Sequence, residues 1–207
     1  MFLYLGLYLD SHLSFKHHVE NIARKIGPVI GILYKIRHLL PVRALKQIYY
    51  GLIHSHLCYM SPSWGNAGVT TIKRIQVLQN RALKMIYNLP ILTPTYNLYN
   101  EHVKDILPVR GISFYSNCKF VASVLHGRIH SCTQFSRITS RGALRDPNRL
   151  NVAAARSFWG GRHIRHRGPS LFNQLPHDLR ALTHKLSFDK QLKKCLLSSE
   201  WIRRFIA

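Results

Sequence analysis

Three stretches in the first half of the chain, each followed by a proline, repeat apolar residues with the period of an α-helix. The predicted helices cover residues 15–40, 42–60 and 72–87. Pro41, Pro62 and Pro90 mark their ends, because proline cannot continue a helix. Gly27 and Pro28 are expected to bend or break the first helix midway. Since each helix has an apolar stripe to bury and the connections are short, we expect an antiparallel three-helix bundle.

The segments around this bundle are expected to be smaller. Residues 2–9 (FLYLGLYL) are short, aromatic-rich and followed by a turn signal, which predicts one β-strand that needs a sheet partner. Beyond the bundle, the pattern predicts helices over residues 96–105, 112–129 and 188–197. We therefore expect a mainly α fold with five segments: a strand remnant (1–14), the bundle (15–92), additional helices (93–130), an irregular Arg-rich linker (131–167) and a small C-terminal helical region (168–207).

The charge balance restricts the class of partner. The chain holds 30 Lys and Arg against 8 Asp and Glu, a net charge of +22, while its 46% hydrophobic content is enough for a core. A compact fold with this charge would repel itself unless a polyanion were near, so nucleic acid is the expected partner. An anionic membrane surface is the second choice, and the remaining alternative is a mitochondrial-type or merely basic surface protein.

Compartment signals favour an intracellular protein. The four cysteines form no CxxC pair, which suits reduced thiols better than a disulfide framework. The first ten residues lack a basic residue before their apolar run, so they make a poor signal peptide. No apolar run approaches the length of a membrane span. We expect a nuclear or cytoplasmic protein that is neither secreted nor bound to a membrane.

The predicted helix over residues 72–87 carries a cationic face. At about 100° per residue, Lys73, Arg74, Arg81 and Lys84 project within one arc of roughly 100°, and apolar residues cover the opposite side. No acid lies within this arc, so its charge is not neutralised inside the helix. Such a helix suits contact with a phosphate backbone. The alternative is a core helix with an ordinary solvated face.

A second basic stretch contains arginine alone. Residues 137–167 hold eight arginines and no lysine, and the first four are spaced by four residues: Arg137, Arg141, Arg145 and Arg149. The planar guanidinium group suits phosphate contacts, and this spacing would align the four side chains if the segment folded into a helix on binding. The alternative is a flexible basic linker without specific contacts.

No catalytic site is evident from the residues. Glu101 and Asp105 are the closest acidic pair and are predicted to share a helix face, as metal ligands would, but such pairs are commonplace on solvated helices. A zinc site from Cys118, His126, His130 and Cys132 lacks the close cysteine pair typical of zinc motifs. There is no P-loop, GxGxxG or GxSxG motif. We therefore expect no metal, no cofactor and no small-molecule substrate for this chain.

Several short strings, in this order and spacing, resemble reverse transcriptases of non-LTR retrotransposons, the jockey-like and CR1-like elements. The strings are residues 4–10 (YLGLYLD), 13–18 (LSFKHH), 59–65 (YMSPSWG), 78–83 (LQNRAL), 168–176 (GPSLFNQLP), 187–188 (SF) and 192–193 (LK). They span nearly the whole chain. Although each string is short, their combined order would be hard to obtain by chance.

The resemblance implies a polymerase built from fingers, palm and thumb that copies RNA into DNA. In that case the strand near Tyr4 corresponds to the end of the palm, and residues 15–92 correspond to the thumb, which closes on the template–primer duplex. The family's F/Y-A-D-D motif, whose carboxylates hold two divalent metal ions, does not occur in this sequence. We therefore expect a truncated polymerase fragment that is not an enzyme as it stands and that binds RNA or DNA backbone. The alternative is a free-standing basic helical protein that binds RNA or assists assembly.

Overall fold

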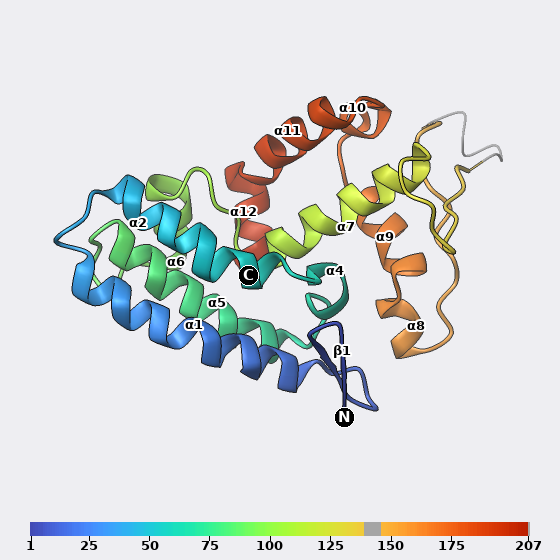
Figure 1. Ribbon diagram of the computed structural model, residues 1–207. Helices are drawn as coiled ribbons and strands as arrows, with labels where there is room; N and C mark the ends of the chain where they lie inside the picture. Colours follow the sequence, from blue (N-terminus) through green and yellow to red (C-terminus); the bar gives the residue numbers. More distant parts are fainter. Residues whose placement is uncertain (139–145, 207) are drawn as a thin grey trace. The chain divides into compact units, whose positions relative to one another are not determined.

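Helices predominate in the computed structural model, which describes residues 1–138 and 146–206, so the expected mainly α fold class is confirmed (Figure 1). The chain forms two compact units. Unit 1 comprises residues 1–113 with 197–207, and unit 2 comprises residues 114–196. The five segments expected from the sequence stay predictions. None of the helices within the described residues combines the length and the apolar character needed to cross a bilayer.

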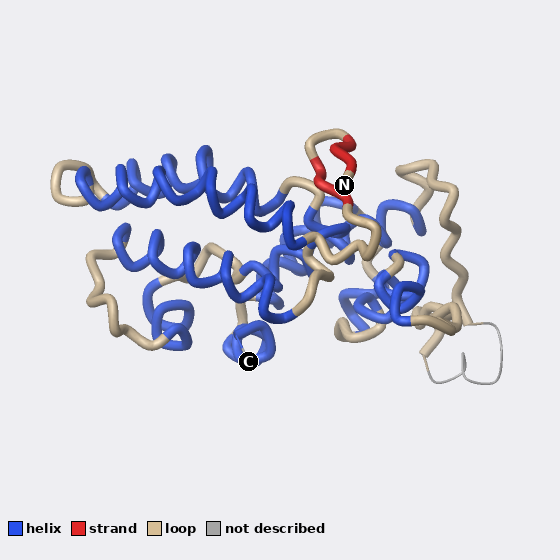
Figure 2. Tube along the Cα trace, turned by 90° about the horizontal axis from the view of Figure 1, so that it is seen from below, coloured by secondary structure: helices blue, strands red, loops and turns tan. Residues whose placement is uncertain are grey.

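The N-terminal segment forms a β-hairpin, so the expectation of a single strand is wrong. Strand β1 (Phe2–Tyr4) pairs antiparallel with β2 (Leu7–Leu9), and both strands are red in Figure 2. The chain reverses at Leu5 and Gly6, whose φ angles of 46° and 78° are both positive, as in a type I′ turn. The strand therefore finds its partner within the same segment. Leu7 is buried, whereas all of β1 is exposed.

Asp10 connects this hairpin to the first long helix. Its carboxylate accepts hydrogen bonds from the backbone N–H groups of His12, Ser14 and Phe15 and from the Ser14 hydroxyl, at 2.8–3.0 Å. Burial opposes ionisation of Asp10, but these hydrogen bonds outweigh it and lower the pKa of its carboxyl group. The turn before the helix is therefore held by one ionised side chain.

Three helical segments of unit 1 lie side by side, as the two ribbon views show (Figures 1 and 2). They are α1 (Lys16–Ile36), the run formed by α2 (Val42–Tyr49), the π-helix η1 (Tyr50–His54) and α3 (Ser55–Cys58), and α5 (Val69–Ile86). Leu45, Tyr49, Ile53 and Leu57 are all almost fully buried, because the wider π-helical turn keeps residues four apart on one face. The middle run is antiparallel to α1 and α5, which confirms the expected bundle.

Helix α1 continues through Pro28, so the expected break is wrong, and the alternative of a bend stays a prediction. Pro28 is exposed to solvent, and a Cβ added at the neighbouring Gly27 would meet nothing within 4 Å. The proline therefore removes one backbone hydrogen bond on the outer side of the helix, where water can bind the freed carbonyl group.

The middle run is followed by a short helix that fixes an aromatic cluster. In α4 (Ser61–Trp64), Trp64 is fully buried and its Nε1 donates to the Tyr59 carbonyl at 2.7 Å. The ring of His18 lies between those of Trp64 and Tyr8, with centroid distances of 5.9 and 6.5 Å. His18 is only 3% exposed, and neither of its ring nitrogens has a hydrogen-bond partner in the structure. Burial, together with the positive charge of Lys25, lowers the pKa of His18 to about 4.

Unit 1 is completed by shorter elements that follow α5 and by the C-terminal helix. These are α6 (Thr95–Asn97), the π-helix η2 (Leu98–His102), the start of α7 (Val109–Leu125) and α12 (Ser199–Ile206). The N-terminal turns of α7 approach α12 closely, because a Cβ at Gly111 would lie 3.0 Å from the Phe205 ring. Glycine at this position therefore permits the contact.

Unit 2 contains the remainder of α7 and four further helices: α8 (Phe158–Arg162), α9 (Ile164–Phe172), α10 (His177–Ala181) and α11 (Lys185–Leu196). Gly168 lets α9 pack on α7, since a Cβ there would lie 2.8 Å from a methyl group of Val121. Asn173 holds the backbone of Leu150 through two hydrogen bonds of 2.8 and 2.9 Å. Most of the 168–176 string therefore serves packing in this unit.

Candidate nucleic-acid interface

Helix α5 separates an apolar side from a cationic side, as its sequence predicts. Its buried residues include Ile72, Ile75, Ala82, Leu83 and Ile86, whereas Lys73, Arg74 and Arg81 are exposed and Lys84 is partly exposed. The buried side packs in the bundle against α1 and α2. The hydrophobic contacts of α5 therefore fix which way its four cations point.

One of these four cations has an acidic partner. Arg74 Nη1 lies 3.3 Å from Glu20 Oε1 on α1, and the two side chains are 61% and 35% exposed. The expectation concerned acids within the helix itself; the acid that pairs with Arg74 comes from α1, which spacing along α5 could not indicate. Exposed pairs of this kind contribute about 0–1 kcal/mol, so a phosphate could replace Glu20 at small cost.

Arg81 and Lys84 line a groove of ≈ 440 Å³ together with the C-terminal half of α1. We call it the α1–α5 groove; Tyr34 of α1, Arg37 directly after α1 and Ile91 also line it. The Arg37 guanidinium carbon lies 4.7 Å from the centroid of the Tyr34 ring. Lys84 Nζ donates to the Ile91 carbonyl at 2.5 Å, which leaves two of its three N–H groups available.

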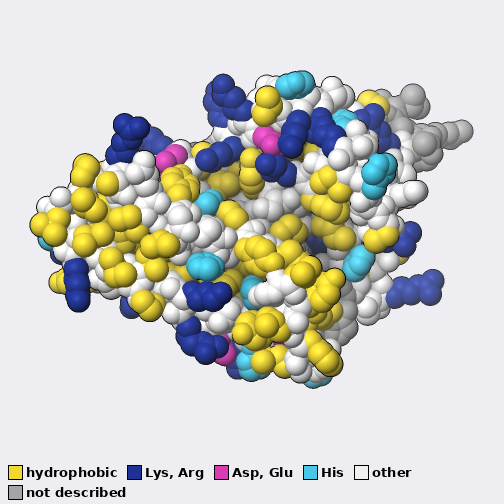
Figure 3. All heavy atoms as spheres, in the orientation of Figure 1, with side chains coloured by type: hydrophobic (Ala, Val, Ile, Leu, Met, Phe, Trp, Pro, Cys, Tyr) yellow, Lys and Arg dark blue, Asp and Glu magenta, His cyan; other side chains and the backbone are white. Residues whose placement is uncertain are grey.

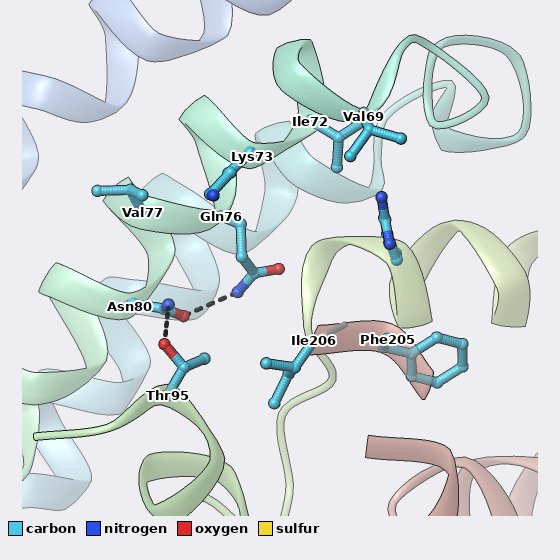
Figure 4. A pocket seen from close by; sticks show the side chains of 10 residues that line it. Val69, Ile72, Lys73, Gln76, Val77, Asn80, Thr95, Phe205 and Ile206 are labelled. Carbon is cyan, nitrogen blue, oxygen red and sulfur yellow. Dashed lines mark hydrogen bonds between the residues drawn. The ribbon is translucent and has the colours of Figure 1, made fainter. Parts of the chain in front are cut away.

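Lys73 lines a second hollow of ≈ 200 Å³, drawn in Figure 4, between α5 and α12. Arg110 of α7 and Phe205 of α12 also line it. Both hollows are lined in part by the same three residues, Val77, Asn80 and Thr95. The cationic side of α5 therefore forms the wall of two adjoining hollows rather than an isolated ridge.

Amide side chains lie between the two sides of α5. Gln79 is fully buried; its Nε2 donates to Tyr49 Oη and to the Leu107 carbonyl, and its Oε1 accepts from Tyr99 Oη, all at 2.9–3.0 Å. Gln76 Oε1 accepts from the backbone N–H of Val109 at 2.8 Å. In the LQNRAL string, Gln79 therefore connects α5 to its neighbours and is not free to bind a ligand, and Asn80 Nδ2 donates to Thr95 Oγ1 at 3.2 Å.

The arginines of the second basic stretch lie in unit 2 and are described only in part. Arg137 forms an isolated antiparallel bridge with Leu150, and Ile138 N–H donates to the Arg149 carbonyl at 3.0 Å. This pairing brings the backbones of Arg137 and Arg149 together, and both residues are exposed. Arg141 and Arg145 lie outside the described residues. The helix expected on binding stays a prediction.

Acidic side chains are few, and basic neighbours neutralise most of them. On the face drawn in Figure 3, Lys and Arg side chains are widespread and Asp and Glu side chains are rare. Within residues 1–138 and 146–206, the Lys and Arg side chains with a carboxylate within 4.0 Å are Lys46, Arg74, Lys119, Arg180 and Arg204. Lys73 and Arg81 are exposed and belong to none of these pairs, so their charge is available to a polyanion.

The described residues gather no group of three or more His, Cys, Asp or Glu side chains that could hold a metal ion. Asp105 accepts hydrogen bonds from Lys46 Nζ and from Tyr50 Oη, at 3.0 and 3.3 Å. It follows the end of η2 at His102, so it does not share a helix face with Glu101. The zinc alternative likewise finds no support, since its four side chains form no such group.

Sequence reasoning missed Tyr34, Arg37 and Arg110. Tyr34 and Arg37 are three residues apart near the end of the first predicted helix, away from its apolar stripe, and this spacing was the available signal. No spacing within one helix could show that they face Arg81, because their sequence separation from it exceeds forty residues. No sequence pattern indicated Arg110 as a binding residue.

The comparisons with known proteins point to one class of enzyme. No protein-family model and no solved structure matches the chain. The chain is similar to a Drosophila melanogaster protein described as "Probable RNA-directed DNA polymerase from transposon BS", with 27% identity over 146 residues. The match covers 67% of this chain but only 16% of the polymerase. It supports a distant relationship to a transposon-encoded RNA-directed DNA polymerase.

Proposed function

We propose that this chain is a thumb-like and C-terminal part of a non-LTR retrotransposon reverse transcriptase, of the jockey-like or CR1-like kind. In this proposal it binds the backbone of RNA or DNA without sequence preference, in the nucleus or cytoplasm, and performs no polymerisation itself. The similarity to a transposon polymerase and the family-like strings support the origin. No cofactor is assigned to the chain; the two divalent ions of a whole polymerase belong to its palm.

The observation that carries the binding proposal is the cationic side of α5. Lys73 and Arg81 are exposed on a helix whose other side is buried, and within the part of the chain that the structure describes neither has a carboxylate within 4.0 Å. Lysine and arginine side chains supply most of the contacts that proteins make with phosphate groups. A helix fixed in a bundle by its apolar side presents these cations in a constant direction. A thumb that follows a duplex requires this arrangement.

The test compares two variants that lose the same charge. The first replaces the cations of α5 with alanine: Lys73, Arg74, Arg81 and Lys84. The second replaces four exposed lysines of α11: Lys185, Lys190, Lys193 and Lys194. Affinities of the full chain for a labelled duplex and a labelled single strand are measured by fluorescence anisotropy over a range of salt concentrations.

Each lost phosphate contact reduces the slope of log K against log salt by about 0.9 on duplex DNA and about 0.7 on a single strand. The α5 variant, which loses four cations, should therefore lose up to about 3.6 from its duplex slope, whereas the α11 variant should keep the wild-type slope. Equal losses in the two variants would mean that net charge, not the α5 surface, determines binding. That outcome would overturn the proposal.

A further inference from the structure

We infer that the α1–α5 groove binds unpaired nucleotides, with a base stacked on Tyr34 and the adjoining phosphates on Arg37, Arg81 and Lys84. This inference rests on the proposed nucleic-acid binding and goes further by naming single-stranded nucleic acid as the ligand. It also makes Tyr34, a neutral residue, the one that distinguishes single strands from duplexes.

The charge of the groove specifies an anionic ligand. Three cations line it, Arg37, Arg81 and Lys84, and its lining contains no Asp or Glu. Arg81 and Lys84 lie on α5, and Arg37 directly follows the last residue of α1, so the cations come from two separate segments of the chain. Arg37 Nε donates to His38 Nε2 at 2.9 Å, and this bond leaves its two terminal nitrogens for a ligand. A chain of phosphates would satisfy several cations at once, as a single carboxylate would not.

The remaining walls specify a ligand that also has apolar faces. Most of the other lining residues are apolar, including Ile30, Met85, Leu89 and Ile91. Tyr34 is 56% exposed and Ile91 is 81% exposed, so both can be reached from solvent. A duplex presents sugar and phosphate along its sides and keeps its base faces stacked inside. An unpaired nucleotide offers both a phosphate and an open base face.

An aromatic ring within a cationic groove is the usual combination in proteins that bind single strands. Here the Tyr34 ring already contacts one cation, since Arg37 lies over it at 4.7 Å. A base could stack against the ring or against the guanidinium plane. The volume of ≈ 440 Å³ lies within the range of about 300–1,000 Å³ that is typical of small-ligand sites. The groove therefore has room for a nucleotide.

The test replaces Tyr34 with alanine in the full chain and measures binding to a short oligothymidylate and to a blunt duplex. Tyr34→Ala should weaken binding to the single strand by about tenfold, which corresponds to one lost stacking contact. Its salt slope should not change, because no phosphate contact is lost. Tyr34→Phe keeps the ring and should bind as the wild type does. Tyr4→Ala, which removes an exposed tyrosine from the hairpin, should have no effect.

The outcomes separate this inference from the proposed function. If the α5 variant loses affinity while Tyr34→Ala binds the single strand normally, the inference fails and the proposed function stands. If neither variant loses affinity, both fail. If Tyr34→Ala lost the same affinity for the single strand and the duplex, the inferred preference for single strands would be wrong. Anionic phosphatidylserine vesicles provide the last probe: if Tyr34→Ala reduces vesicle binding and leaves oligonucleotide binding unchanged, the groove binds lipid headgroups and the inference is wrong.

Discussion

Replacing His18 with leucine should remove a large part of the acid sensitivity of unit 1. His18 is 3% exposed, lies between the rings of Tyr8 and Trp64, and has no hydrogen-bond partner on either ring nitrogen. The charged imidazolium would therefore have neither water nor an acid to stabilise it, and nearby Lys25 would repel it. Leucine has a similar volume and cannot take up a proton.

The magnitude follows from the two pKa values of His18. The pKa is 6.5 in the unfolded chain and about 4 in the folded protein, so between these values the unfolded state binds more protons. Stability is therefore complete above pH 6.5 and is lost as the pH falls towards 4. The loss attributable to His18 is about 2 kcal/mol at pH 5 and reaches about 3 kcal/mol below pH 4.

The assay is urea denaturation of wild type and variants at pH 7 and pH 5, followed by circular dichroism. At pH 5 the carboxylates whose pKa is lowered, Asp10 and Asp146, are still ionised, so they contribute little to the difference. The matched control is His17→Leu, since His17 is exposed on the same helix and its side chain is 56% accessible. His18→Leu should lose about 2 kcal/mol less than wild type between the two pH values. An identical loss in wild type and His18→Leu would refute the reasoning.

Four substitutions test the packing within each unit by thermal unfolding and hydrogen exchange. Gly65→Ala should cost about 3 kcal/mol, because the added Cβ would lie 2.5 Å from a backbone carbonyl oxygen. At Gly31 an added Cβ would meet nothing within 4 Å, so Gly31→Ala should instead stabilise α1 by about 1 kcal/mol. A higher melting temperature for Gly65→Ala than for Gly31→Ala would contradict both predictions. Gln79→Leu should cost about 3 kcal/mol by leaving buried partners unsatisfied; a wild-type melting temperature would show that the amide is dispensable. Asn173→Asp should cost about 2 kcal/mol and speed exchange of the Leu150 amide, whereas unchanged exchange would exclude the Asn173 contact as an anchor.

The long helices could be predicted from the sequence because their apolar spacing already determines which side is buried. The hairpin could not, because its turn places Leu5 at a position with positive φ where Asn, Asp or Gly is the usual signal. The effect of Pro28 on α1 could not be predicted either, because it depends on whether the proline is exposed to solvent, which residue identity does not give. Local rules therefore failed where the outcome depended on an unusual backbone angle or on the neighbouring surface.

The candidate interface was predictable to the extent that it lies on one helix. The arc of Lys73, Arg81 and Lys84 follows from the helical period alone. The ion pair between Arg74 and Glu20 and the position of Arg37 depend on how α1 packs against α5, which is a tertiary property. Sequence spacing therefore identifies the cations of α5, whereas the contributions of Glu20 and Arg37 follow only from the structure.

The buried amides of α5 have a consequence for how the surface tolerates change. If α5 turned about its axis by one residue, about 100°, Gln79 would leave Tyr49 and Tyr99, and its amide would face hydrocarbon. Only one rotation of α5 about its axis therefore lets the buried Gln79 amide keep its hydrogen bonds. Exchanges among the outward residues leave that rotation unaltered, so the cations can vary in identity without altering their direction. A one-residue insertion between Ile72 and Gln76, by contrast, would rotate the residues before it by about 100° relative to those after it. The buried side and the cationic side could then not both keep their positions.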